Sequence, residues 1–239
     1  MNYQNKSNKS YIEAIVKKKN SSRRGGRHKE HKNSEKKIFS DIKNKLNLKN
    51  NDNLIDIGCG AGPVCDYLVK YASKKNINLT LNDIPEVIRF LKKRYKKNKK
   101  IKYISGEFQK TKIKKKFNKV LCYSVIQCTN NPNTFFDKIL NSVHGQSSIL
   151  IGDIPNTSKK KRFLSSKFGK KFEEKRIGKK ITNISAYLKK NEQNILINDG
   201  LLKKFLIKSK KRGFNFFILK QDNKLPFSYT REDILIEKF

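Results

Sequence analysis

The sequence has few cysteines and no long apolar run. Its four cysteines, at positions 59, 65, 122 and 128, form no Cys-X-X-Cys pair and are not spaced with histidines as in metal sites. We therefore expect reduced thiols in a cytoplasmic protein without a bound metal. No apolar segment approaches the length of a membrane span, and the N-terminus lacks the hydrophobic core of a signal peptide.

Acidic residues are also scarce. The 239 residues include 20 Asp and Glu against 57 Lys and Arg, which gives a formal net charge of +37. This balance invites an RNA-binding interpretation, because basic domains collect phosphates. Only nine of the 57 basic residues are arginine, however, and lysines occur in nearly every segment. We interpret the charge as a compositional bias on all solvated faces, so nucleic acid is a possible partner but not the favoured one.

The most informative stretch is Leu54–Gly62, a hydrophobic strand that runs into a turn with three alternating glycines: Gly58, Gly60 and Gly62. Glycines let the backbone turn tightly and approach a ligand without Cβ atoms in the way. Pro63 then occupies a favoured first-turn position of a helix. A nucleotide-type ligand commonly rests on such a strand–turn–helix unit.

The chemistry of the turn favours a cationic ligand. The dinucleotide fingerprint requires G-x-G-x-x-G, whereas here the third glycine comes one residue early and position 63 is proline. Asp56, at the end of the strand, would also repel a pyrophosphate. S-adenosylmethionine, with its sulfonium and α-ammonium groups, fits better. At this point the chain resembles the class I S-adenosylmethionine-dependent methyltransferases, whose first motif has this acid and glycine pattern.

Three later strands extend the resemblance, and the last of them, residues 119–127, resembles the family's fourth strand, whose exit flanks the methyl donor. Asp83 ends a second strand 25 residues after Gly58, a distance at which a carboxylate can bind a ribose diol. A third strand leads to Glu107, where the family commonly has an acid that accepts from the adenine amino group. The resemblance implies cofactor-binding roles for Asp56, Gly58, Gly60, Gly62, Asp83, Ile84, Glu107, Phe108 and Ser124.

The order of elements predicts an α/β, Rossmann-like fold. Strands are expected at 53–58, 78–82, 101–104, 119–124, 148–153, 214–220 and 232–237, and helices at 63–74, 85–97, 132–143 and 199–212, with a further helix after Ser34. Alternation of this kind implies parallel strands, and the last two, joined without a helix, must be antiparallel. We therefore expect a mostly parallel seven-stranded sheet with an antiparallel C-terminal strand and helices on both faces.

Two segments fall outside this alternation. Residues 1–35 are basic and polar and form a tail or a lid, and residues 36–239 form the methyltransferase domain. Within that domain, residues 156–196 are a basic stretch with sparse apolar positions, longer than an ordinary connection. We interpret this stretch as a partly helical insert on the acceptor side.

The acceptor is expected beyond strands four and five, at the switch point of the sheet. That position nominates Tyr123, Ser124 and Gln127 on one strand and Asp153 and Asn156 on the other. Asp153 is the best candidate for a base, although it also suits a turn-capping role. His28 and His31 reach the acceptor if the N-terminal segment folds over the cofactor as a lid, as happens in this family, but they also suit a solvated tail.

The residues after strand four favour a small-molecule acceptor. Amino-adenine methyltransferases carry an Asn/Asp-Pro-Pro-aromatic signature there, whereas this chain has Ser124 to Gln127. Residues 152–164 and 231–236 also resemble bacterial methyltransferases associated with surface-sugar biosynthesis. We expect methyl transfer to a small molecule, such as a hydroxyl of a sugar or a related metabolite. The alternatives are an RNA methyltransferase that uses the lysine-rich surface and a non-catalytic interaction protein that keeps the cofactor fold.

Overall fold

A seven-stranded sheet forms the centre of the molecule. The computed structural model describes residues 12–13, 34–113, 116–192 and 197–239. The strands lie in the order β3-β2-β1-β4-β5-β7-β6. β7 runs antiparallel to both of its neighbours, β5 and β6, and all other neighbouring strands are parallel. Their bounds are β1 Asn53–Ile57, β2 Asn78–Asp83, β3 Lys102–Ser105, β4 Phe117–Tyr123, β5 Val143–Pro155, β6 Asn215–Leu219 and β7 Arg231–Lys238. The predicted sheet, with its antiparallel C-terminal strand, is confirmed.

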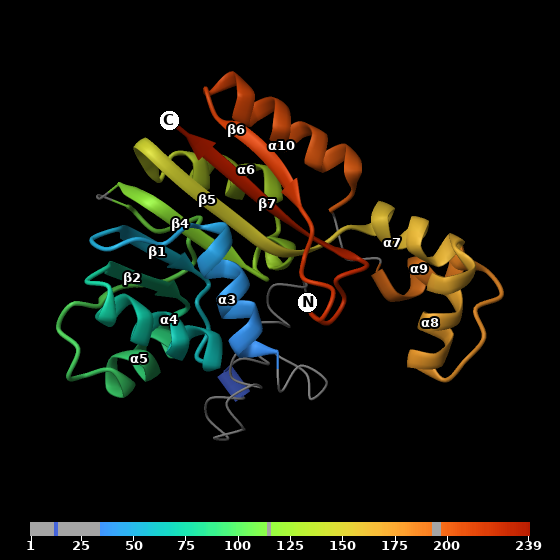
Figure 1. The fold of residues 1–239 in the computed structure, drawn as a ribbon, viewed down its shortest axis with the longest axis horizontal. Helices are drawn as coiled ribbons and strands as arrows, with labels where there is room; N and C mark the ends of the chain where they lie inside the picture. The colour runs from blue at the N-terminus through green and yellow to red at the C-terminus, as the bar shows by residue number, and fades with distance from the viewer. Residues whose placement is uncertain (1–11, 14–33, 114–115, 193–196) are drawn as a thin grey trace.

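Helices cover both faces of this sheet (Figure 1). One face packs on α3 (Glu35–Lys45), α4 (Pro63–Lys74) and α5 (Pro85–Arg94), and the other on α6 (Pro132–Leu140) and α10 (Asp199–Lys211). Each helix contributes one apolar face, as its sequence pattern requires. The sheet therefore separates two hydrophobic cores, one of which contains the stacked rings of Phe136 and Phe205.

The insert forms three short helices that extend beyond the end of β5 (Figure 1). These are α7 (Thr157–Ser165), α8 (Lys167–Ile177) and α9 (Ile184–Glu192), and α7 packs against both of the others. Asn156 and Ser166 cap α7 and α8 with their side chains. Among the helices in the described ranges, none is long and apolar enough to cross a bilayer.

Several boundaries differ from the sequence prediction, and the largest difference is at β5. The helix expected at 132–143 ends at Leu140, and the strand expected at 148–153 extends from Val143 to Pro155. The extension arises from tertiary pairing, because Val143 lies beside Phe117 of β4 and Pro155 beside Arg231 of β7. His144, which falls between the expected helix and strand, consequently lies in β5 at the end distant from the predicted ligand edge.

The topology places the predicted cofactor-binding residues and Asp153 at one edge of the sheet. β1 lies between β2 and β4, so the strand order reverses there, and the parallel strands β1, β2, β4 and β5 end on the same side. Ligands of open α/β sheets bind outside such a reversal. The short 3-10 helix η2 (Ile126–Cys128) follows β4 at this edge.

Candidate active site

The turn between β1 and α4 presents bare backbone at the reversal. Gly58 and Gly60 have left-handed φ angles of +67° and +60°. A Cβ atom on Gly58 would lie 2.5 Å from Cγ2 of Val125, so glycine alone fits this position. Gly62 is the N-cap of α4, and Pro63 follows in its first turn.

Asp83 ties the end of β2 to this turn. Its Oδ2 accepts a hydrogen bond from the Gly60 N–H at 2.7 Å, and its Oδ1 accepts one from the Ile84 N–H at 2.7 Å. Burial raises the pKa of Asp83 to about 6, although these two N–H groups act in the opposite direction. Each carboxylate oxygen keeps a second lone pair, so the group can still accept from a diol.

Asp56 lies beneath the turn and is 4% exposed. Burial raises the pKa of its carboxyl to about 8, and the negative charge of Asp83 adds to the effect. Among the described residues, none donates a hydrogen bond to this carboxylate. A buried acid with a raised pKa is stabilised in its ionised form by a cation, so Asp56 suits a positively charged ligand.

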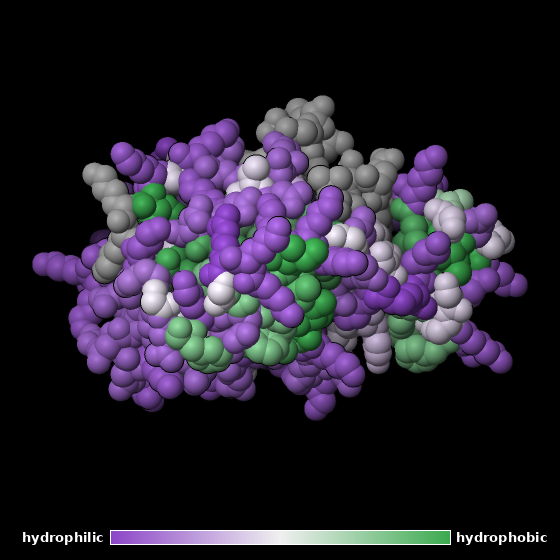
Figure 2. All heavy atoms as spheres, turned by 90° about the horizontal axis from the view of Figure 1, so that it is seen from above, coloured by the Kyte–Doolittle hydropathy of each residue, from purple (hydrophilic) through white to green (hydrophobic). Residues whose placement is uncertain are grey.

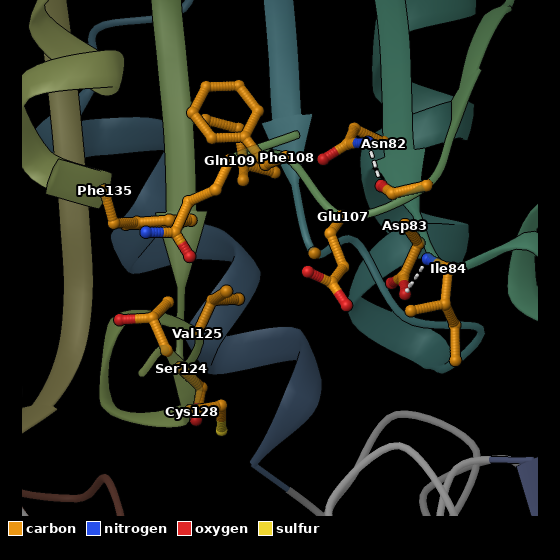
Figure 3. A pocket seen from close by; sticks show the side chains of 14 residues that line it. Asn82, Asp83, Ile84, Glu107, Phe108, Gln109, Ser124, Val125, Cys128 and Phe135 are labelled. Atoms are coloured by element: carbon orange, nitrogen blue, oxygen red, sulfur yellow. Dashed lines mark hydrogen bonds between the residues drawn. The ribbon is translucent and has the colours of Figure 1, made fainter. Parts of the chain in front are cut away.

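Two adjoining hollows meet at Gly58 and Ser124, which line both of them. One hollow is lined by Asp56, Gly60, Gly62, Pro63 and Tyr123, with Glu35 from α3. The other is lined by Asp83, Ile84, Glu107, Phe108, Gln109, Val125, Cys128 and Phe135, among others. Figure 3 shows Asp83 and Glu107 on one side of the second hollow, and Ser124, Val125 and Cys128 on the other. The cofactor candidates are therefore gathered at one place on the molecule.

The second hollow combines acidic and apolar walls. The Glu107 carboxylate makes an ion pair of 2.9 Å with Lys110, whose side chain is largely exposed. Phe108 is buried and packs edge-on against Phe135, with ring centroids 5.5 Å apart. Such a site suits a planar, partly polar group. The assignment of Glu107 to an adenine amino group and of Phe108 to the ring stays a prediction.

Ser124 and Asp153 meet at the ends of β4 and β5. The Ser124 hydroxyl donates to Oδ2 of Asp153 at 2.8 Å, and the Gln127 amide donates to the Ser124 Oγ at 3.2 Å. Both residues have left-handed backbones, with φ of +63° for Ser124 and +56° for Asp153. Left-handed residues other than glycine carry strain, which is found most often at functional sites.

The remaining acceptor-side candidates lie in different surroundings. Asn156 is 1% exposed, and it caps α7 while it donates to Asp199 and Glu232, so its side chain is committed to structure. Tyr123 lines the first hollow. Its ring packs directly on Gly152, where an added Cβ would lie only 2.4 Å from Cδ2 of Tyr123. His28 and His31 lie outside the described residues.

Sequence reasoning missed several residues that line the hollows. Asn82 precedes Asp83, and its amide donates to the carbonyls of Ile104 and Gly106, which fixes the β2 and β3 ends together. Its position at a strand end was a usable signal. Glu35, Gln109 and Phe135 had no such signal, because they reach the hollows from other elements through the tertiary fold. Within the described ranges, no three His, Cys, Asp or Glu side chains are grouped to hold a metal ion.

The central part of the chain matches a known family. Residues 55–151 match the family model described as a methyltransferase domain. This segment is similar to a methyltransferase domain. It contains the glycine turn, both buried acids and the Ser124 strand end, so the geometry above and the family match concern the same residues.

Solved methyltransferases share the fold of this chain over most or nearly all of its length. The N-methyltransferase NodS from Bradyrhizobium japonicum WM9, in complex with S-adenosyl-L-homocysteine, aligns at a TM-score of 0.61 and 11% identity over 96% of this chain and 98% of its own. The plantazolicin methyltransferase BamL, in complex with a triazolic desmethylPZN analogue and S-adenosylhomocysteine, aligns at 0.60 and 18% identity over 99% and 97%. The methyltransferase domain of bacterial CtHen1-C aligns at 0.57 and 14% over 85% and 96%. No curated protein matches the sequence.

Neighbours of the same fold are bound to S-adenosylhomocysteine, the product of S-adenosylmethionine, so S-adenosylmethionine is the cofactor to compare with this site. The residues present fit such a cofactor. Two buried acids with raised pKa values call for positive charge, and Gly58 lines both hollows without a side chain.

Proposed function

We propose that the protein transfers the methyl group of S-adenosylmethionine to a hydroxyl of a small molecule, such as a sugar or a related metabolite. Ser124 and Asp153 carry this proposal, because a hydroxyl acceptor must lose a proton and these residues form a hydrogen-bonded pair at the acceptor edge. Ser124 lines both hollows, and Asp153 lies behind it.

When bound, the cofactor would supply an electrophilic methyl group on a sulfonium, with the neutral thioether as the leaving group. The chain's own residues position the reactants and move the proton. The acceptor hydroxyl gives its proton to Ser124 Oγ while Ser124 gives its own proton to the Asp153 carboxylate at Oδ2. Asp56, Asp83 and the glycine turn hold the donor end, and orientation alone contributes much of the rate in such displacements.

We propose the insert, residues 156–196, as the acceptor side of the site. Phe163 of α7 stacks on Tyr229 at 5.3 Å, and Phe168 and Phe172 of α8 pack against the same ring. The rings of Phe168, Phe172 and Tyr229 are 58%, 45% and 42% exposed. Aromatic faces with nearby polar groups are typical of small-molecule sites. At the insert end of Figure 2, hydrophobic side chains lie among hydrophilic ones.

The aromatic cluster of Phe163, Phe168, Phe172 and Tyr229 adjoins the candidate base through one arginine. Arg231 follows Tyr229 by two residues, and its guanidinium donates to the Asp153 carbonyl at 3.0 Å. Its Nε lies 4.0 Å from Asp153 Oδ1. This contact supports an acceptor held between the insert and Asp153. The role of residues 1–35 as a lid that carries His28 and His31 stays a prediction.

Methyl-labelled S-adenosylmethionine incubated with the protein and a cell extract tests the proposal. The extract is separated into RNA, protein and small-molecule fractions, and label is expected in the small molecules. Label in RNA would favour the lysine-rich surface as a substrate-binding face and contradict the small-molecule assignment. Donor binding without label in any fraction would favour the non-catalytic alternative.

The roles of Ser124 and Asp153 are tested with Asp153→Asn and Ser124→Ala in the same assay. We expect each to lower the rate by roughly 10²–10⁴-fold with donor affinity unchanged, the range for loss of general base catalysis. Asp222→Asn is the matched control, because Asp222 is exposed and pairs with Lys37 away from the site. Equal loss of rate and donor affinity in Asp153→Asn would assign Asp153 to structure instead.

A further inference from the structure

Asp153 lies in an irregular part of β5. The pairing of β5 with β7 shifts register between Ile151 and Ile154, and Asp153 has a φ of +56° within that shift. Bulges of this kind redirect a side chain and are common beside active sites. A regular strand would point residue 153 differently, so the left-handed backbone is what brings its carboxylate to Ser124.

Two side chains of β7 hold the backbone of Asp153 in this conformation. The Asp153 N–H donates to Oδ1 of Asp233 at 2.8 Å, and the Asp153 carbonyl accepts from Arg231 at 3.0 Å. Both polar groups of the strained residue are thus satisfied by side chains rather than by the sheet ladder. Asp233 is fully buried, so no water competes for its oxygens.

Asp233 is in turn fixed by α3 and by the loop before β7. Lys45 of α3 donates to Oδ2 of Asp233 at 2.6 Å, and the Gln221 amide donates to Oδ1 at 3.0 Å. Lys45 also binds Asp41 at 2.6 Å, one turn earlier on α3. A buried carboxylate that accepts from a cation and two N–H groups is fully compensated, and its position is strongly determined.

We infer that Asp233 is a positioning residue for methyl transfer, which, together with Lys45, holds Asp153 in the left-handed conformation that presents its carboxylate to Ser124. The inference rests on the proposed function of Asp153. It connects α3, the helix that follows the N-terminal segment, with the acceptor edge of the sheet.

Both carboxylate oxygens of Asp233 act as hydrogen-bond acceptors. An asparagine there could still accept from the Asp153 N–H, but its NH₂ group would then face the ammonium of Lys45. Replacing Lys45 by glutamine as well removes this conflict, because the carbonyl of the new glutamine can accept from the amide of the new asparagine. Recovery of the methyl-transfer rate in the double variant would therefore not be explained by a merely structural role for either residue.

The experiment measures initial rates with labelled S-adenosylmethionine and the extract fraction that accepts label. Asp233→Asn is expected to lower the rate at saturating acceptor at least tenfold, with calorimetric donor affinity unchanged. The double variant Asp233→Asn with Lys45→Gln is expected to recover most of that loss. Asp41→Asn is the control, because it removes the negative charge of the other partner of Lys45 without touching Asp233.

Different results identify different failures. A folded Asp233→Asn variant with the wild-type rate, beside an inactive Asp153→Asn, would overturn the positioning role alone. A wild-type rate in Asp153→Asn would overturn the proposed base itself. Rates that follow the melting temperature through all variants, without rescue in the double variant, would reduce Asp233 to a stabilising residue.

Discussion

Asp56 and Asp83 are two acids in one small volume at the ends of β1 and β2. Burial raises the pKa of Asp56 to about 8 and that of Asp83 to about 6, and in Asp56 the charge of Asp83 adds to burial. Two buried carboxylates repel each other unless a proton or a cation lies between them. A sulfonium and an ammonium provide such charge, whereas a pyrophosphate would add to the repulsion.

Replacement of Asp83 tests its part in donor binding. Asp83→Ala removes hydrogen bonds to a charged acceptor, so donor binding is expected to weaken by roughly 1–3 kcal/mol in calorimetry. The loss of its contacts with Gly60 and Ile84 adds a structural effect, which circular dichroism of the variant monitors. Asp222→Ala serves as the exposed control. An unchanged donor affinity in a folded Asp83→Ala variant would remove Asp83 from the site.

Among the individual site residues, the sequence predicted those that lie within its motifs. Asp56, Gly58, Gly60, Gly62 and Asp83 are consecutive features of one strand–turn–helix–strand unit, so their proximity follows from local structure. Asp233 and Lys45 could not be found in this way. They are 188 residues apart, and only the placement of β7 beside β5 and of α3 over the sheet brings them together.

The turn from β1 to α4 requires glycine at position 58. Gly58→Ala is expected to lower the free energy of unfolding by roughly 2–4 kcal/mol, because left-handed strain adds to the clash with Val125. Chemical denaturation measures this change.

Gly145→Ala is the matched control for that substitution. Its φ is +54°, but a Cβ there meets nothing within 4 Å, so strain alone applies and the expected cost is about 1–2 kcal/mol. Equal costs at the two glycines would show that the contact with Val125 contributes nothing.

The strand β5 shows why element boundaries were harder to predict than element types. Its apolar centre is evident in the sequence, but its ends, Val143 and Pro155, are set by partners on β4 and β7. The left-handed conformation of Ser124 carries no sequence signal, and that of Asp153 only a weak one, because aspartate visits this region occasionally and serine rarely. Pairing between distant segments therefore determines the part of the site that the motifs do not contain.

The net charge of the whole molecule, +37, leads to a testable prediction about RNA binding. If lysines are spread over all solvated faces, RNA binding is expected to be weak and unselective and to disappear near physiological ionic strength. Filter binding of transfer RNA and of an unrelated RNA at rising salt measures this. Tight binding of one RNA class at physiological salt would contradict the small-molecule assignment.

The central claim is that the buried acids at the sheet reversal bind a cationic methyl donor. Below pH 8 Asp56 is protonated in the free protein and must release its proton to pair with a cation. The measurement is calorimetric titration with S-adenosylmethionine between pH 6 and 7.5, with the wild type and Asp56→Asn compared so that titration of the ligand itself cancels. We expect the dissociation constant to fall with pH more steeply in the wild type than in the variant, by up to about tenfold more per pH unit. The same pH dependence in both proteins would contradict it, as would saturation of the site by ATP or NAD in place of the sulfonium compound.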